Sequence, residues 1–403
     1  MFTLGIDVAK QSHRYLLLNP EGKKIRSSSF ENSSQGFQSL WQQLQDLKIP
    51  PQDLLIGMEA TGCFWENLYS FLKEKGFPTV LLNPFHVKKF REALGKKAKT
   101  DEIDALVIAQ FLRTQGYVQS QVAEENIQSL RELTRLRFEL LNENKNYHRQ
   151  VCSLLTLIFP EYEQTFLKNP FTATSRAILE KFPTAKKLAQ AKPKQIEKIV
   201  RSIHGNPFDL QEITALLTAA KNSIYSGRAE EARSTSLRIL LTQVASLLAA
   251  IQKLEEEIHK ILSSQESEKN GPGENLLTIP GVGEKTQAAT LSYLGEKGTN
   301  FSSSTDAVGY IGFFPKIHQS GQTRRENKIC KRGPKVLRWA LYMAAVASVK
   351  HNPEMKILYQ QKCAQGKTKK QALICVGKKL LQIMLAMLKS GKPYNPQLVF
   401  KQA

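Results

Sequence analysis

The first hundred residues alternate short apolar runs with polar turns, the pattern of a sheet interrupted by helices. Three runs near the N-terminus predict short strands, at 2–9, 13–20 and 23–30. The Pro20-Glu21-Gly22 turn joins the second run to the third as an antiparallel meander. The pattern then predicts, in order, a helix over 35–47, a strand over 53–60, a helix over 64–75, a strand over 78–84 and a helix from Thr100. This order indicates a mixed sheet with helices on its faces.

Two long helical patterns occupy the middle of the chain, over 124–158 and 236–262. In the second, apolar residues recur at alternating steps of four and three, which is the seam of a coiled coil. The seam positions are Leu240, Val244, Leu247, Ile251, Leu254, Ile258 and Ile261. A seam needs a partner surface, and two fit: a second protomer, or the 124–158 helix of the same chain. Between the two patterns lies a proline-broken helical insertion at about 165–228, whose lysines suit RNA binding and equally suit a solvated face.

These patterns divide the 403 residues into three expected domains. An α/β domain covers 1–118, a helical and coiled-coil region covers 119–268, and a mostly helical C-terminal domain covers 269–403. The Gly271-Pro272-Gly273 linker marks the start of the last part. The predicted fold class is therefore α/β plus α.

Charge narrows the class of partner. The chain has 57 Lys and Arg against 36 Asp and Glu, a net charge of +21, with the 41% hydrophobic content of a globular protein. From Phe313 to the end there are 19 Lys and Arg but only two acids, which indicates a nucleic-acid surface there. The residues expected to contact nucleic acid are Lys316, Arg324, Arg325, Lys328, Lys331 and Arg332, with Lys96, Lys97 and Lys99 from a flexible basic loop expected over 86–99.

The same composition argues against other classes. No apolar run approaches the roughly 18 residues that cross a bilayer, and the chain opens without a signal-peptide pattern. Five scattered cysteines, odd in number and without CxxC spacing, argue against a disulfide framework and a zinc site and fit reduced thiols. We therefore expect a cytoplasmic protein with no membrane partner.

Four carboxylates stand at the ends of the predicted elements of the first domain: Asp7, Glu59, Asp101 and Asp104. A parallel neighbour of the first strand would bring Glu59 beside Asp7, and the i, i+3 spacing puts Asp101 and Asp104 on one helix face. Such a cluster suits a hard divalent cation such as Mg²⁺, and two ions could activate the attacking oxygen and stabilise the leaving oxygen of a phosphodiester. The same acids could instead have structural roles. Thr100 can cap the helix, and the acids in its first turn would be stabilised by the helix dipole.

The C-terminal domain contains two further candidates for chemistry. The Pro280-Gly281-Val282-Gly283 turn resembles a helix-hairpin-helix, and a plain helix-turn-helix fits it nearly as well. Ser320, followed by Gly321, lies among cations that suit a phosphate under attack, although a serine before glycine is usually only a turn residue. His318 is a candidate base for Ser320 in an extended segment, or a phosphate contact. Tyr310, an alternative nucleophile, lies in an apolar run that predicts the core.

These residues together resemble a known family. The segments GIDVAK, GMEATG, LLNP, KTDEIDA, LTIPGVG, GYIGFFP, SG and KRGPKVLRWAL, in this order, are similar to the transposases of the insertion sequence 110 family, the bridge-RNA-guided DEDD recombinases. The resemblance covers about 3–115 and 270–350. It implies an RNase H-like (RuvC-like) N-terminal domain whose tetrad Asp7, Glu59, Asp101 and Asp104 binds Mg²⁺. It further implies that Ser320 is the nucleophile and forms a transient phosphoserine link to DNA.

The resemblance also implies partners. Members of the family assemble as a tetramer around a structured guide RNA whose loops pair with donor and target DNA, and the coiled-coil segment would join protomers. Two other readings remain. A RuvC-like two-metal nuclease, such as a junction resolvase, would explain the carboxylates but not the basic domain around Ser320. A non-catalytic nucleic-acid-binding protein with a degenerate nuclease fold would not explain four intact carboxylates.

Overall fold

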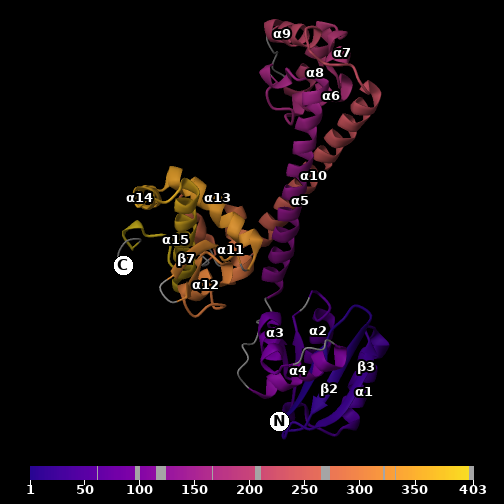
Figure 1. The fold of residues 1–403 in the computed structure, drawn as a ribbon, viewed down its shortest axis with the longest axis vertical. Helices are drawn as coiled ribbons and strands as arrows, with labels where there is room; N and C mark the ends of the chain where they lie inside the picture. The colour runs from indigo at the N-terminus through magenta and orange to yellow at the C-terminus, as the bar shows by residue number, and fades with distance from the viewer. Residues whose placement is uncertain are drawn as a thin grey trace. The chain divides into compact units, whose positions relative to one another are not determined.

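The computed structural model divides the chain into two compact units, Met1–Val122 and Ala123–Ala403 (Figure 1). It describes residues 1–60, 62–95, 100–114, 124–165, 167–204, 210–264, 273–320, 323–331 and 333–398. For residues 204, 264, 316–320 and 323–328 the backbone alone is described.

The first unit is built on a five-stranded mixed sheet with the strand order β3-β2-β1-β4-β5. β1 pairs with β2 antiparallel and with β4 parallel, and β4 pairs with β5 parallel. The elements in chain order are β1 (Phe2–Asp7), β2 (Ser12–Leu18), β3 (Lys24–Glu31), α1 (Ser34–Asp46), β4 (Leu54–Glu59), α2 (Glu66–Glu74), β5 (Thr79–Leu82), α3 (Pro84–Ala93) and α4 (Asp101–Arg113). The structure confirms the predicted antiparallel meander and the mixed sheet with helices on its faces.

Alternation along the strands gives the sheet two buried faces. Leu4, Ile6 and Met58 belong to a core cluster that includes residues of α1 and α2. On the opposite face, Gly5 lies against α4, and a Cβ at this position would overlap the backbone of Ala105. Glycine therefore lets α4 pack directly on β1, which fixes this helix against the end of the sheet.

The basic segment after β5 departs from the prediction. Residues expected to begin a flexible loop at 86 instead form α3, which runs over Pro84–Ala93. Asn83 caps this helix by accepting a hydrogen bond from the Phe85 amide at 2.9 Å, and Pro84 occupies its first turn, where a missing N–H costs nothing. Val87 is buried and Phe90 is partly buried against the same core, and with Leu94 they follow a helical spacing that the basic residues between them obscured.

The second unit begins with a two-helix stalk, α5 (Glu125–Ile158) and α10 (Glu230–Ser264), which pack along one another. The start of α5 shares a core with the end of α10, while the end of α5 shares a second core with the start of α10, so the helices are antiparallel. Val244, Ile251 and Ile258 of the predicted seam are buried. The seam's partner in this structure is thus α5 of the same chain, the second of the two expected surfaces.

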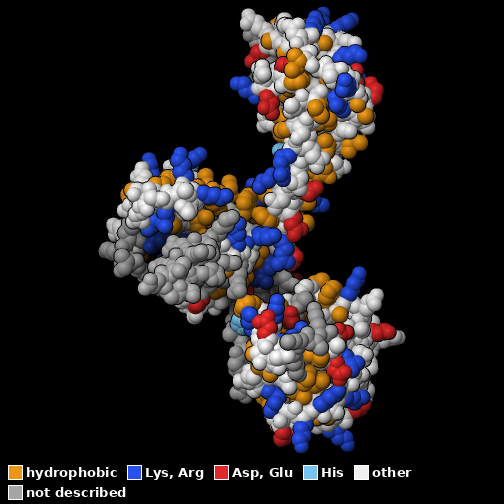
Figure 2. Space-filling view, in the orientation of Figure 1, with side chains coloured by type: hydrophobic (Ala, Val, Ile, Leu, Met, Phe, Trp, Pro, Cys, Tyr) orange, Lys and Arg blue, Asp and Glu red, His pale blue; other side chains and the backbone are white. Residues whose placement is uncertain are grey.

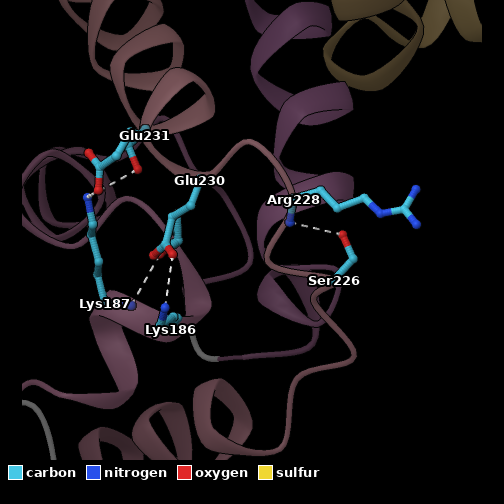
Figure 3. A network of polar contacts seen from close by, with 8 residues as sticks. Lys186, Lys187, Ser226, Arg228, Glu230 and Glu231 are labelled. Atoms are coloured by element: carbon cyan, nitrogen blue, oxygen red, sulfur yellow. Dashed lines mark hydrogen bonds and ion pairs between the residues drawn. The ribbon is translucent and has the colours of Figure 1, made fainter.

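The predicted helical insertion forms the far end of the stalk (Figure 1). It comprises α6 (Ala173–Lys181), α7 (Ala185–Ala189), α8 (Pro193–His204) and α9 (Leu210–Lys221). Figure 3 shows how ion pairs attach α7 to the first turn of α10: Lys186 pairs with Glu230 at 3.3 Å and Lys187 with Glu231 at 2.8 Å. Two of the lysines considered for RNA binding are therefore engaged within the protein.

The rest of the second unit forms a mostly helical C-terminal part, as predicted, around one large core. Its elements are α11 (Glu284–Leu294), α12 (Ser304–Ile311), β6 (Pro315–Ser320), β7 (Thr323–Ile329), α13 (Lys335–His351), α14 (Pro353–Ala364) and α15 (Lys369–Ser390). The β6–β7 hairpin was not predicted, because its strands are polar and lack an apolar alternation. The prediction that Tyr310 lies in the core is wrong, since this residue is 43% exposed at the end of α12.

Two helices, α10 and α15, are long and apolar enough to span a membrane by length and composition alone. This differs from the expectation that no stretch would reach that length. Both helices have protein partners in this structure: α10 packs on α5, and α15 packs on α13 and α14. Packing against these neighbouring helices therefore covers apolar residues of both α10 and α15.

Candidate active site and nucleic-acid interface

Asp7 and Glu59 end two neighbouring parallel strands. In the β1–β4 register Ile6 lies opposite Met58, so Asp7 and Glu59 occupy the next position along the pair. Both residues are half-buried. The parallel pairing that the sequence predicted is present, and it brings the backbone of these two acids to the same edge of the sheet.

α4 delivers the other two candidate acids. The Thr100 hydroxyl caps the helix by accepting a hydrogen bond from the Ile103 amide at 3.3 Å, as predicted. Asp101 and Asp104 both lie in the first turn, where Asp101 is exposed and Asp104 is half-buried. Glu102, between them, pairs instead with Lys24 and Arg14, and the hydrogen bond from Lys24 lowers the pKa of Glu102. These pairs tie the start of α4 to β2 and β3.

Asp104 forms an ion pair with Arg91 of α3. The side chains are only 13% and 22% exposed respectively, so solvent screens this pair less than a surface pair. Sequence analysis placed Arg91 in a flexible basic loop and missed it as a site residue. Nothing in a single sequence links these two positions, because the pairing depends on how α3 packs against α4.

The carboxylate set was tested for its fit to a divalent cation. All four candidates offer oxygen ligands, which hard cations prefer, and Asp7 and Glu59 lie at the same sheet edge. Across the residues that the structure describes, however, no three His, Cys, Asp or Glu side chains form a group that could hold a metal ion. The ion pair of Asp104 with Arg91 supplies a physical reason. The donor chemistry fits, and the assembled four-carboxylate site stays a prediction.

The segment after Asp7 is held by a buried histidine. The Ala9 amide donates a hydrogen bond to Nδ1 of His13 at 3.2 Å, and the His13 side chain is completely buried. Burial lowers the pKa of His13, with a hydrogen bond involving Asn32 acting in the opposite direction. A neutral imidazole, which can accept at Nδ1, is the form that this contact requires. The loop leaving the β1 edge therefore depends on an uncharged His13.

Ser320 is the last residue of β6 and lies opposite Thr323 in the hairpin register. The hairpin gives the segment the extended conformation that the interpretation of His318 as a base requires. The side chains of Lys316, Ser320, Arg324, Arg325 and Lys328 lie outside the described ones. Lys331 is exposed with a positive φ of 56°, whereas Lys96, Lys97, Lys99 and Arg332 lie outside the described residues.

The glycine-rich turn at 280–283 follows a short 3-10 helix (Glu274–Thr278) and precedes α11, so only one regular α-helix flanks it closely. Gly281 has a φ of +93° and lies against Ser348 of α13, where a Cβ would not fit. The Ser348 hydroxyl donates to the Pro280 carbonyl at 2.9 Å. These contacts give the turn a packing role in the C-terminal core.

A charged network that the sequence did not indicate joins the stalk to the C-terminal part. Glu255 of α10 accepts from Arg137 of α5 at 2.8 Å and pairs with Lys285 of α11 at 2.7 Å. Burial would raise the pKa of Glu255, but the hydrogen bonds from Lys285 and Arg137 outweigh it and lower the pKa. The network connects three helices at the base of the stalk.

Comparisons with known proteins identify the class. A model of the DEDD transposases, described as transposase, matches residues 4–160. A second, described as transposase of the IS116/IS110/IS902 family, matches residues 273–360. The chain is 24% identical to an uncharacterised 43.6 kDa protein of insertion element IS110 from Streptomyces coelicolor, over 98% of this chain and 96% of the relative.

Two other relatives have functional names. The chain is 24% identical to a pilin gene-inverting protein of Moraxella bovis, over 98% of both chains. It is 23% identical to the transposase of insertion sequence element IS1111A of Coxiella burnetii, over 97% of this chain and 91% of the relative. The protein is therefore an enzyme of the DNA transposase and recombinase class. It belongs to the IS110 family of DEDD transposases.

Proposed function

We propose that this transposase cuts and rejoins DNA by attack of Ser320 on a phosphodiester, with the acids of an RNase H-like first unit in the same reaction. The observation that carries the proposal is the parallel β1–β4 register, which brings Asp7 and Glu59 to one sheet edge beside the helix that bears Asp101 and Asp104. The mixed sheet and the matching DEDD family support the RNase H-like assignment.

The proposed step conserves the energy of the broken bond. The Ser320 hydroxyl attacks phosphorus and forms a phosphoserine ester, while the displaced deoxyribose oxygen leaves and takes up a proton. The proton lost by Ser320 passes to a base, for which His318 and the carboxylates are the candidates. In the second half, a deoxyribose hydroxyl of another strand attacks the phosphoserine, rebuilding a phosphodiester and releasing the serine. The number of phosphate esters is unchanged, which direct hydrolysis cannot achieve.

The four acids have a defined part in this scheme. Asp7, Glu59, Asp101 and Asp104 would hold Mg²⁺, which when bound supplies Lewis-acid stabilisation of the charge that develops on the phosphate. Lys and Arg around Ser320 neutralise the same phosphate. The proposal requires the serine and the carboxylates to act on one phosphodiester, within one chain or between protomers.

We further propose a structured guide RNA, donor and target DNA, and a tetramer as partners. The net charge of +21 supports polyanionic partners, and the name of the pilin gene-inverting relative supports strand exchange between DNA sites. Exposed apolar residues on the two stalk helices, Leu136 of α5 and Ile239 and Leu248 of α10, support contact between protomers. Sequencing of RNA that copurifies with the protein tests the guide: an RNA encoded beside the transposase gene is expected.

A suicide DNA substrate tests the serine. The full-length protein is incubated with nicked DNA, guide RNA and Mg²⁺, and the digested product is searched for a DNA-linked peptide that contains Ser320. We expect the adduct in the wild type and its loss in Ser320→Ala and in metal-free buffer. Thr323→Ala is the matched control, because it removes a hydroxyl from the register partner of Ser320. Cleavage with free ends by Ser320→Ala at the wild-type rate would instead establish a two-metal nuclease.

A further inference from the structure

A groove runs beside the second half of α15, away from the β6–β7 hairpin in sequence and lined by residues to which no role has been given. Its volume is about 510 Å³. One wall consists of α15 residues and the chain that follows the helix, and the other of the serines that begin α12. The lining includes Ser302, Lys379, Ile383, Lys389, Lys392 and Tyr394.

The groove is basic, and none of the described residues that line it is an acid. Between residues 335 and 398 the chain has twelve Lys and Arg and one acid, Glu354. Figure 2 shows several Lys and Arg side chains on the visible face of this part of the second unit. In the described residues, no lysine of this stretch forms an ion pair with a carboxylate. A concentration of uncompensated cations at a concave surface attracts a polyanion.

Two acids contact residues that line the groove: Asp306 of α12, beside Ser302 and Ser303, and Glu354 of α14, which hydrogen-bonds the Tyr394 side chain. Asp306 accepts hydrogen bonds from the hydroxyls of Ser302 and Ser303, at 2.7 and 2.8 Å, and these bonds lower its pKa, with a smaller contribution from the charge of Lys389. Lys389 donates to the Ser302 carbonyl at 2.8 Å, which fixes its ammonium at the edge of the groove with further N–H groups to spare. Among the described residues no side-chain partner holds Lys379 or Lys392 in this way, so both ammonium groups are available to an incoming phosphate.

The other component of the groove is aromatic and apolar. Tyr394 is half-buried, and its position is set at both ends: its amide donates to the Thr278 hydroxyl at 2.9 Å, and its hydroxyl lies 3.1 Å from the Asn352 amide nitrogen. Ile383 lies on the α15 wall beside it. A rigid aromatic ring next to lysines is the combination by which proteins bind single-stranded nucleic acid, with bases stacked on the ring and phosphates on the cations.

Dimensions favour a single strand over a duplex. The cavity has the volume of a small-ligand site, which admits part of one chain and not a double helix. Lys379 and Lys389 are ten residues apart, about 15 Å along the helix at 1.5 Å per residue. At about 3.4 Å per phosphate along one strand, this distance corresponds to roughly four nucleotides.

We propose that the α15 groove binds a short single-stranded segment of the DNA substrate, with phosphates at Lys379, Lys389 and Lys392 and a base on Tyr394. The inference rests on the proposed function, because strand exchange exposes single-stranded DNA that must be held while the ends are exchanged. DNA is chosen over RNA because the enzyme is a DNA transposase; an RNA strand is an outcome that the test can return.

The test measures binding of fluorescent dT12 and rU12 to the full-length protein by anisotropy across a salt series. The variant is Lys379→Gln with Lys392→Gln, and Lys389 is left intact because it supports Ser302. The matched control is Lys356→Gln with Lys367→Gln, two exposed lysines of the same part that do not line the groove. We expect the groove variant to lose at least tenfold in dT12 affinity, and its salt slope to fall by about 1.4 for two lost phosphate contacts. The control should lose less than threefold.

Tyr394 gives an independent readout. Tyr394→Ala should lower dT12 affinity about fivefold or more through lost stacking, whereas Tyr394→Phe keeps the ring and should bind like the wild type. Equal loss in the groove and control lysine variants would overturn the proposal, as would a Tyr394→Phe defect as large as that of Tyr394→Ala. Stronger binding of rU12, lost in the groove variant, would also overturn it and assign the groove to RNA.

The serine adduct assay separates the two proposals. If the wild type forms no Ser320 adduct, the proposed function fails, and dT12 binding still decides the groove because it requires no catalysis. If the adduct forms while the groove variant binds dT12 as the control does, the groove proposal alone fails.

Discussion

Arg91 and Asp104 form an ion pair between α3 and α4, at the first turn of the helix that carries two of the four candidate metal ligands. A guanidinium that is ion-paired with a carboxylate competes with a metal cation for the same oxygen atoms. The pair therefore supplies a counter-charge for Asp104 in the absence of metal. Metal binding at Asp104 would have to displace Arg91 or share the carboxylate with it.

Replacing Arg91 should raise the affinity for Mg²⁺ if the four acids form one site. Arg91→Gln removes the competing charge, so the midpoint of Mg²⁺-dependent thermal stabilisation is expected at a concentration several-fold lower than in the wild type. In EDTA the same variant should be less stable by about 1–3 kcal/mol, because Asp104 loses a charged hydrogen-bond partner. Lys89→Gln, which breaks the exposed pair with Glu92 on the same helix, is the control. A rise in the Mg²⁺ midpoint for Arg91→Gln would contradict the competition.

The stability of the first unit should decrease as the pH falls below about 6.5, the ordinary pKa of histidine. Burial lowers the pKa of His13, so the unfolded chain takes up a proton at a pH where the folded chain does not. The contribution of neutral His13 to the free energy of unfolding is therefore complete above pH 6.5. It is lost as the pH falls toward the pKa that His13 has in the folded chain. Protonation also removes the acceptor for the Ala9 amide. Chemical denaturation at several pH values between 5 and 7.5 measures the slope.

The His13→Gln variant should flatten this slope, because glutamine does not titrate. His86→Gln, at an exposed position on α3, should leave it as in the wild type. An unchanged slope in His13→Gln would assign the pH dependence to other groups.

Gly5 should tolerate no side chain. A methyl group there would overlap the backbone of Ala105 and Ala109, so Gly5→Ala must push α4, with its two acids, away from β1. We expect a loss of several kcal/mol in the unfolding of the first unit, at least the 1–3 kcal/mol typical of overpacking. Gly309→Ala, in the last turn of α12 where an added Cβ meets nothing within 4 Å, is the control and should be neutral or slightly stabilising. A Gly5→Ala protein as stable as the wild type would show that α4 does not depend on this contact.

Sequence patterns predicted the features that depend on local hydrophobic periodicity. The strand of Asp7 and the strand of Glu59 are buried and apolar, so their positions and the acids that end them could be read directly. α5 and α10 were also predicted, because long helices repeat their pattern many times. Their pairing with one another was left open, since a seam does not specify whether its partner is in the same chain.

The missed elements share a physical cause. α3 is short and lysine-rich, with only Val87, Phe90 and Leu94 at helical spacing, and the β6–β7 hairpin is polar, so the hydrophobic signal in both is weak. Both are specified by capping, turn geometry and tertiary packing. The Arg91–Asp104 pair and the Glu255 network likewise join positions distant in the chain, and a single sequence carries no signal for such contacts.

The two faces of the stalk should respond differently to the same substitution. Val244 is fully buried against the stalk interior, whereas Ile239 is 56% exposed on the same helix. Val244→Asp buries an unpaired charge and should unfold the stalk, with loss of helical signal in circular dichroism and a lower melting temperature. Ile239→Asp has no such cost, so its circular dichroism should match the wild type. If the outer face of the stalk joins protomers, Ile239→Asp should instead lower the mass measured by light scattering. An unchanged mass in Ile239→Asp, with the helical signal retained, would mean that protomers associate through other surfaces.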